Sequence, residues 1–143
     1  MDHVAIMKKS WNLTKKILSK DKTIETRWYK NKYKPFNNIK EGETIYFKES
    51  GCLVTIKATV SKVEQFENLN LNTTKEIIKK YALKDLGTEI IPKEIEDYTS
   101  NKKYCIVVHL QNPEKVEPFN INKKGFGAMS SWICVKNIED IKI

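Results

Sequence analysis

The segment Lys22-Thr23-Ile24-Glu25-Thr26-Arg27-Trp28-Tyr29 is the densest mixture of acidic, basic and aromatic residues in this chain. Its alternating character predicts a β-strand over residues 23–30. Neighbouring side chains of a strand point to opposite faces, so we expect Glu25, Arg27 and Tyr29 to share one face. The other face then carries Ile24, Thr26 and Trp28. Same-face neighbours are roughly 7 Å apart, which allows the Glu25 carboxylate to pair with the Arg27 guanidinium.

Arg27 is the only arginine among 26 basic residues. A guanidinium offers a planar fork of donors that lysine cannot reproduce, so one interpretation is that this position needs the fork. The other interpretation is compositional bias, because the chain is rich in Lys, Ile and Asn, as an AT-rich genome would encode. The sequence leaves both interpretations open.

The shared face of this strand suggests a binding floor. Arg27 would clamp a phosphate or a carbonyl oxygen. Glu25 would accept a hydrogen bond from a base edge or act as a general base, and Tyr29 would stack or donate. Lys22, at the mouth of the strand, would supply a point charge. The alternative is an exposed ion pair that contributes ~0–1 kcal/mol and has no function.

The rest of the chain predicts a mixture of strands and helices. A long strand over residues 53–66 changes the phase of its apolar residues near Ser61-Lys62, which predicts a β-bulge. The spacing Thr73-x-x-Glu76 predicts a capping box for a helix that Gly87 ends. Pro92 suits the first turn of a second short helix with Ile91, Ile95 and Tyr98 facing inward. Residues 104–110 are apolar on both faces and predict a central strand. Further strands are expected over residues 4–8, 44–48 and 131–135, and a short helix with Ser10 as its N-cap.

Composition indicates one folded domain over residues 1–143, since 40% of residues are hydrophobic and 31% are charged. No apolar run approaches the ~20 residues that cross a bilayer, and the first residues lack the pattern of a signal peptide. We therefore expect a cytoplasmic protein without a membrane partner. The three cysteines form no Cys-x-x-Cys pair, and the two histidines lie far from them, so we expect no metal site. No glycine-rich phosphate loop is present, and we expect no cofactor.

All of the excess positive charge lies in the first 40 residues. That segment holds 11 basic and 3 acidic residues, whereas residues 41–143 hold 15 of each, and the net charge is +8. A one-sided basic surface with interleaved aromatic residues is typical of proteins that bind nucleic acid. The alternatives are a lysine-rich face that serves solubility, or one that docks an acidic protein partner.

Two pieces of the chain resemble the ASCH domain family. The first is the run Lys22-Thr23-Ile24-Glu25-x-Arg27, which follows a helix and a short polar turn, and the second is Ile39-Lys40-Glu41-Gly42-Glu43-Thr44-Ile45-Tyr46-Phe47. The family pattern is Gly-x-Lys-Thr-[Ile/Val]-Glu-x-Arg followed by a Val-Gly-Asp turn. Here Glu43 stands in for the aspartate, and Ser19 or Lys20 lies where the family often has glycine. The resemblance covers residues 1 to 66, and the remainder fits only in its strand order.

The resemblance implies a PUA-like fold, which is a small mixed α+β barrel with flanking helices. It also implies an RNA- or nucleotide-binding pocket built on Lys22, Glu25, Arg27 and Tyr29. The oligomeric state and the ligand are left open.

The resemblance also leaves a catalytic alternative open. One branch of the family is an amidohydrolase that acts on an acetylated cytidine and carries Lys-Thr-Ile-Thr with a later glutamate, and another branch cleaves RNA phosphodiesters. Here Lys22 matches the lysine, but Glu25 occupies the position of the second threonine. Asp85 or Glu89 lies where the later acid is expected. If the chain is an enzyme, the resemblance assigns the catalytic roles to Lys22 and Glu25.

Overall fold

Six strands form one curled sheet in this computed structural model, which describes residues 1–143. The strand order across the sheet is β2-β5-β4-β3-β1-β6. The strands are β1 (Asp2–Met7), β2 (Ile24–Tyr29), β3 (Thr44–Glu49), β4 (Val54–Phe66), β5 (Tyr104–Phe119) and β6 (Trp132–Val135). The helices are α1 (Leu13–Leu18), α2 (Leu71–Leu86) and α3 (Lys93–Thr99), with 3-10 turns η1 (Lys9–Trp11) and η2 (Ile138–Asp140). The fold is α+β, which confirms the predicted class.

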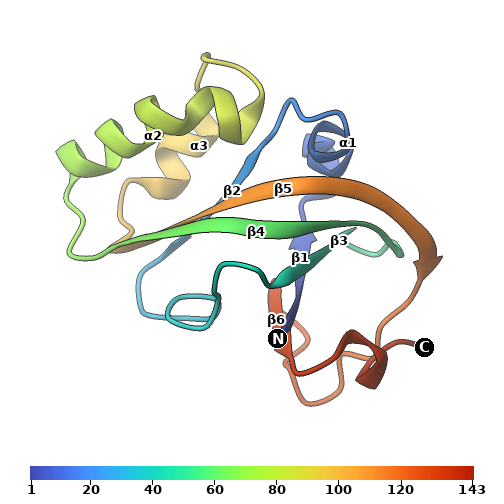
Figure 1. Cartoon of the computed structure of the whole chain (residues 1–143). Coiled ribbons are helices and arrows are strands. Elements are labelled where there is room, and N and C mark those ends of the chain that lie inside the picture. Colours follow the sequence, from blue (N-terminus) through green and yellow to red (C-terminus); the bar gives the residue numbers. More distant parts are fainter.

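The sheet curls into a half-barrel. The long strands β4 and β5 cross the molecule side by side, and β1 pairs with β3 in parallel while the other neighbours are antiparallel (Figure 1). β2 lies at one end of the strand order, yet the Arg27 side chain donates hydrogen bonds to the backbone carbonyls of Ile6 and Ser131. Ile6 lies in β1 and Ser131 directly precedes β6. Arg27 therefore connects β2, at one end of the strand order, to β1 and the start of β6 at the other end.

The predicted bulge in the long strand is confirmed. The pairing of β4 with β5 shifts its register between Val60 and Lys62, and two further shifts lie nearer the start of β4. Each bulge bends the strand and increases its twist, because an extra residue has no partner opposite it. The bulges therefore account for the curl that brings the ends of the sheet together.

Helix α2 covers the side of the sheet near β2 and β5, with α3 next to it (Figure 1). Its buried stripe contains Ile77, Ile78 and Tyr81, which pack in one cluster with Ile24 and Trp28 of β2. The helix ends at Gly87, as predicted, in the left-handed conformation with φ of 73°. This packing fixes the last turn of α2 beside the start of β2.

The main core lies inside the curled sheet and includes residues from α1 and five strands, all except β2. Cys105 and Cys134 are buried thiols, and Cys52 is partly exposed. Burial raises the pKa of the Cys134 thiol to about 11, so it stays protonated at neutral pH. Trp28 and Phe36, two of the aromatics interleaved with the basic residues, also belong to the core.

Several local predictions were wrong. The capping box of α2 starts at Asn70 rather than Thr73, because Asn70 and Thr73 exchange side-chain and backbone hydrogen bonds. Ser10 lies within η1, and Asn12 precedes α1 in the left-handed conformation. β5 continues to Phe119, well beyond residue 110, because β4 provides a long pairing partner. Tyr98 was expected to face inward, but it is 52% exposed.

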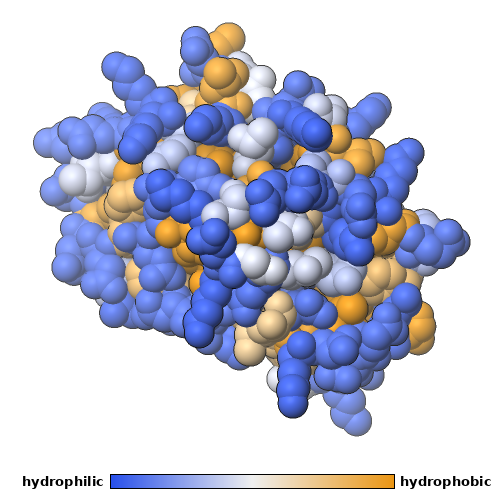
Figure 2. Space-filling model, viewed as in Figure 1, coloured by the Kyte–Doolittle hydropathy of each residue, from blue (hydrophilic) through white to orange (hydrophobic).

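The surface seen in Figure 2 is mostly hydrophilic, with hydrophobic residues showing in small separate areas. None of the helices combines the length and the apolar character that crossing a bilayer requires.

Candidate functional site

The best-defined polar cluster joins the loop before β2 to the last turn of α2. The Lys22 ammonium lies 2.5 Å from Oδ1 of Asp85 and also donates to the Asp85 backbone carbonyl at 2.7 Å. Lys22 is only 1% exposed, and the Asp85 side chain is 17% exposed. Lys22 lies just before β2, at the mouth of the strand as expected, and the packing of α2 on β2 buries it. Of the two acids proposed to complete the site, Asp85 is therefore the one beside Lys22.

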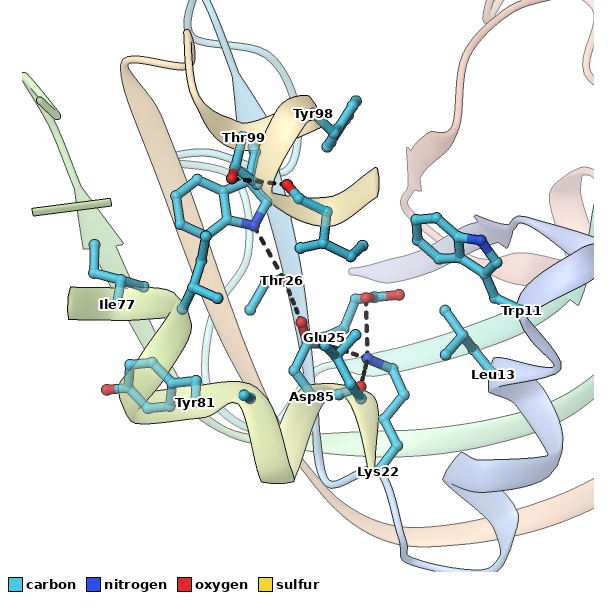
Figure 3. Close-up of a pocket in the computed structure, with 15 residues that line it drawn as sticks. Trp11, Leu13, Lys22, Glu25, Thr26, Ile77, Tyr81, Asp85, Tyr98 and Thr99 are labelled. Atoms are coloured by element: carbon cyan, nitrogen blue, oxygen red, sulfur yellow. Dashed lines mark hydrogen bonds and ion pairs between the residues drawn. The ribbon is translucent and has the colours of Figure 1, made fainter. Parts of the chain in front are cut away.

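Glu25 is the second acid of this cluster. Its Oε1 lies 3.4 Å from Lys22 Nζ, so the three N–H groups of the ammonium all face acceptors. Its Oε2 lies 3.5 Å from Arg27 Nη2, which confirms the predicted pairing along the strand. Glu25 is 4% exposed, yet it lines two adjoining cavities. In Figure 3 the side chains of Lys22, Glu25 and Asp85 converge, with Trp11 standing across from them.

Burial and opposite charges set the protonation of this cluster. Burial alone would lower the pKa of Lys22, but the nearby charges of Asp85 and Glu25 outweigh it and raise that pKa. Burial raises the pKa of Asp85, the Glu25 charge adds to this, and the Lys22 charge opposes it. Lys22 therefore remains an ammonium at neutral pH. A charged amine has no free lone pair, so Lys22 acts as a positive charge and not as a nucleophile in this state.

Thr26 extends the cluster, and analysis of the sequence alone missed it. Its hydroxyl donates to Oδ2 of Asp85 at 2.7 Å and accepts from the indole N–H of Trp28 at 3.3 Å. Asp85 is thus held by Lys22 and Thr26 together. The strand alternation placed Thr26 and Trp28 on one face, but only the position of α2 shows that Asp85 is their partner.

The guanidinium of Arg27 donates its hydrogen bonds to groups within the protein. Its Nη1 donates to the Ser131 carbonyl at 3.2 Å, and its Nη2 donates to the Ile6 carbonyl at 3.2 Å. Its guanidinium carbon lies 5.1 Å from the centre of the Trp132 ring. The side chain is 14% exposed and lines the cleft described next. A lysine cannot reach both carbonyls in this geometry, which gives the lone arginine a structural reason.

Two adjoining cavities lie over this cluster. The larger is a cleft of about 320 Å³ with Glu25 and Arg27 of β2 among its lining residues, and aromatic rings of Trp11 and Tyr98 from η1 and α3. The smaller, of about 70 Å³, lies toward α2 and is lined by Lys22, Asp85 and apolar side chains of that helix. Both share Glu25 and Thr26. We call the larger cavity the β2 cleft.

Lys8 and Glu94 lie at one side of the β2 cleft. Their charged groups are 2.6 Å apart and link the residue before η1 to α3, and Lys8 Nζ lies 4.7 Å from the centre of the Trp11 ring. Both side chains are more than half exposed, so the ion pair adds little stability.

The other candidate residues lie elsewhere. Tyr29 points away from the β2 cleft and donates its hydroxyl to the Lys34 carbonyl at 3.1 Å. Glu89 is exposed and has no contact with Lys22. His109 also lies outside the cluster and shares a hydrogen bond with Glu64 at 2.6 Å. No group of three or more His, Cys, Asp or Glu side chains is arranged to hold a metal ion.

No protein-family model matches this chain, and no curated protein matches its sequence. Solved structures do match its fold. A crystal structure of ASCH from Zymomonas mobilis superimposes with a TM-score of 0.69 at 15% sequence identity, covering 97% of this chain and 90% of that one. A tyrosine-to-phenylalanine mutant of that protein gives a TM-score of 0.69 at 15% identity, covering 97% and 93%. A serine-to-alanine mutant gives 0.70 at 14% identity, covering 97% and 91%.

This chain therefore has the PUA-like fold of ASCH proteins, over nearly its whole length. The resemblance seen in the sequence is confirmed at the level of the fold.

Proposed function

We propose that this chain is an ASCH-type protein that binds RNA or a nucleotide, with a base held in the β2 cleft. The observation that carries the proposal is the cleft itself, where aromatic rings of Trp11 and Tyr98 accompany the charged groups of Glu25 and Arg27. Aromatic rings suit the flat face of a base, and a carboxylate suits the amino group on its edge.

The size and polarity of the cleft support a base-sized ligand. Its volume of about 320 Å³ is at the lower end of the range for small-molecule sites, roughly 300–1,000 Å³. Glu25 Oε2 faces Arg27 at a long 3.5 Å, so this oxygen retains the capacity to accept a further hydrogen bond. A base amino group that donates to it would distinguish bases with such a group from those without one.

The charge of the N-terminal segment supports RNA as the source of the base. The excess of eight positive charges within residues 1–40 lies in the part of the chain that forms β1, η1, α1 and β2. These elements supply most of the lining of the β2 cleft. Lysines around the cleft would attract the phosphates of a strand while the cleft takes a base.

Binding of a labelled ten-nucleotide single-stranded RNA, followed by fluorescence anisotropy, tests this proposal. Glu25→Gln keeps the shape of the side chain and removes its charge, so we expect affinity to fall roughly 5- to 150-fold, equivalent to 1–3 kcal/mol. The matched control is Glu114→Gln, which removes one charge from an exposed ion pair with Lys57. Equal affinity for wild type and Glu25→Gln would place the RNA elsewhere.

The convergence of Lys22, Glu25 and Asp85 favours a second candidate, a hydrolase acting on a modified nucleoside or on RNA phosphodiesters. Glu25 would be the general base, since it lines the cleft, and the Lys22 ammonium would stabilise developing negative charge. Asp85 would hold the Lys22 ammonium in place through its carboxylate and its backbone carbonyl.

Two substrates test this candidate. Release of acetate from acetylated cytidine and cleavage of the ten-nucleotide RNA would be followed with wild type and Glu25→Gln. If wild type hydrolyses one of these substrates and Glu25→Gln does not, the result supports the hydrolase. If wild type binds the RNA tightly and turns over neither substrate, the result supports a protein that binds RNA without hydrolysing it.

A further inference from the structure

A second hollow adjoins the β2 cleft. It has a volume of about 730 Å³ and is lined by Tyr29, Tyr33 and Lys34 from the end of β2 and the segment after it, and by residues 125–134. We call it the Tyr33 groove. None of its lining residues belongs to the ion-pair cluster of Lys22, Glu25 and Asp85.

The groove continues the cleft. Ser131 lines both cavities, and its carbonyl oxygen accepts the hydrogen bond from Arg27. Trp132 lines the groove, and its ring packs against the Arg27 guanidinium on the side of the cleft. The cleft and the groove therefore meet at Ser131.

The Tyr33 groove differs in charge from the β2 cleft and the smaller cavity beside it. The β2 cleft and the smaller cavity beside it are lined by three cationic and three anionic side chains, which are Lys8, Lys22, Arg27, Glu25, Asp85 and Glu94. Each of these acids already faces at least one of these cations. The groove is lined by one charged side chain, Lys34, and by no acid. A phosphate is therefore disfavoured beside Glu25 and favoured in the groove.

Tyr33 offers an aromatic surface in the groove. It is 59% exposed, and its ring meets Tyr29 in a T-shaped contact, with ring centres 6.0 Å apart and planes at 69°. The Tyr29 hydroxyl donates to the Lys34 carbonyl and so holds this segment against β2. A base can stack on the exposed part of the Tyr33 ring, as bases do on proteins that bind single strands.

Hydrogen bonds order the opposite side of the groove. Lys123 donates to the carbonyls of Ala128 and Ser130, and the Ser130 hydroxyl donates to the Trp132 carbonyl. These bonds restrain the loop over residues 125–131, which lowers the entropy cost of binding. Met129, at 95% exposed, adds an apolar side chain beside the groove.

We propose that the Tyr33 groove binds the nucleotide that follows the base held in the β2 cleft, with its base on Tyr33 and its phosphate near Lys34. This inference rests on the proposed function and makes it narrower. The ligand is a single-stranded RNA of two or more nucleotides, and a free mononucleotide occupies only the cleft.

The test compares two probes, the labelled ten-nucleotide RNA and a nucleoside monophosphate that competes with it. In Tyr33→Ala, RNA affinity falls roughly 5- to 150-fold, the range for loss of one stacked base, and the inhibition constant of the mononucleotide is unchanged. In Lys34→Gln, the slope of log affinity against log salt becomes smaller by about 0.7, as expected for loss of one phosphate contact. Both residues are exposed, so neither variant should impair folding.

Lys75→Ala, an exposed lysine on α2, is the control for surface changes outside the groove. If Tyr33→Ala and Lys34→Gln bind the RNA as Lys75→Ala does, while Glu25→Gln weakens it, the groove proposal is overturned and the cleft proposal stands. The same holds if wild type binds the mononucleotide as tightly as the RNA. If wild type binds neither probe, both proposals fail.

Discussion

The ammonium of Lys22 lies 2.5 Å from the carboxylate of Asp85, although the two residues are 63 positions apart in the chain. The contact joins the loop before β2 to the last turn of α2 and thereby fixes one wall of the smaller cavity beside the β2 cleft. Removing one member leaves the other with an incomplete set of partners in a buried position, whereas removing both leaves a smaller electrostatic penalty.

A double-mutant cycle on this pair should show strong coupling. We expect Lys22→Met and Asp85→Ala each to lower the free energy of unfolding by about 3 kcal/mol. The first leaves two carboxylates without their ammonium, and the second leaves the buried ammonium with Glu25 as its one charged partner. The double variant should lose less than the sum by 1–3 kcal/mol. Urea unfolding of the four proteins measures this, and additive losses would show that the contact contributes no pairwise energy.

Arg27→Lys keeps the charge and removes the fork. We expect it to lower the free energy of unfolding by about 1–3 kcal/mol, because the hydrogen bonds to the Ile6 and Ser131 carbonyls are lost together. Hydrogen exchange should then rise first in β1 and β6, which Arg27 connects to β2. Unchanged stability would mean that positive charge alone is needed at this position.

His3 should make stability depend on pH. Its Nδ1 accepts from the Trp132 indole at 3.1 Å, so its Nε2 carries the hydrogen and donates to Glu43 at 3.0 Å. Burial lowers the pKa of His3 below 6.5, although Glu43 opposes the shift. Below pH 6.5 the unfolded chain therefore binds more protons than the native state, and stability falls as pH is lowered.

Urea unfolding at pH 7.5, 6.5 and 5.5 measures this effect. His3→Gln should lower stability but reduce the loss between pH 6.5 and 5.5. The same loss in wild type and His3→Gln would assign the pH dependence to other groups.

RNA affinity should fall with salt. For three to five phosphate contacts on single-stranded RNA, the slope of log affinity against log salt is about −2 to −3.5. Anisotropy titrations between 50 and 200 mM salt give this slope directly, where ~150 mM is physiological. A slope near zero would mean that the lysines of residues 1–40 make no phosphate contacts.

The sequence predicted best what depends on local pattern. The alternation over residues 23–30 placed Glu25 beside Arg27, and the change of apolar phase near Ser61 predicted the bulge of β4. Both follow from side-chain period, which a strand imposes wherever it lies in the fold. The end of α2 at Gly87 was predictable for a similarly local reason, because glycine readily adopts the left-handed backbone conformation that ends a helix.

What the sequence could not predict depends on tertiary packing. Asp85 and Glu89 are close in the chain, and only the docking of α2 on β2 selects Asp85 as the partner of Lys22. The carbonyl partners of Arg27 depend on the curl of the whole sheet. Tyr29 shares a face with Glu25 along the strand, yet that curl separates it from the β2 cleft and places it in the Tyr33 groove.

The most direct test of the central claim follows the indole N–H signals of the three tryptophans by NMR while the ten-nucleotide RNA is added. Trp11 lines the β2 cleft and makes no indole hydrogen bond within the protein, whereas the indole of Trp132 is buried and bonded to His3. We expect the Trp11 signal to move most and to saturate with the binding isotherm. A Trp11 signal that stays in place while RNA binds would contradict a base in the β2 cleft.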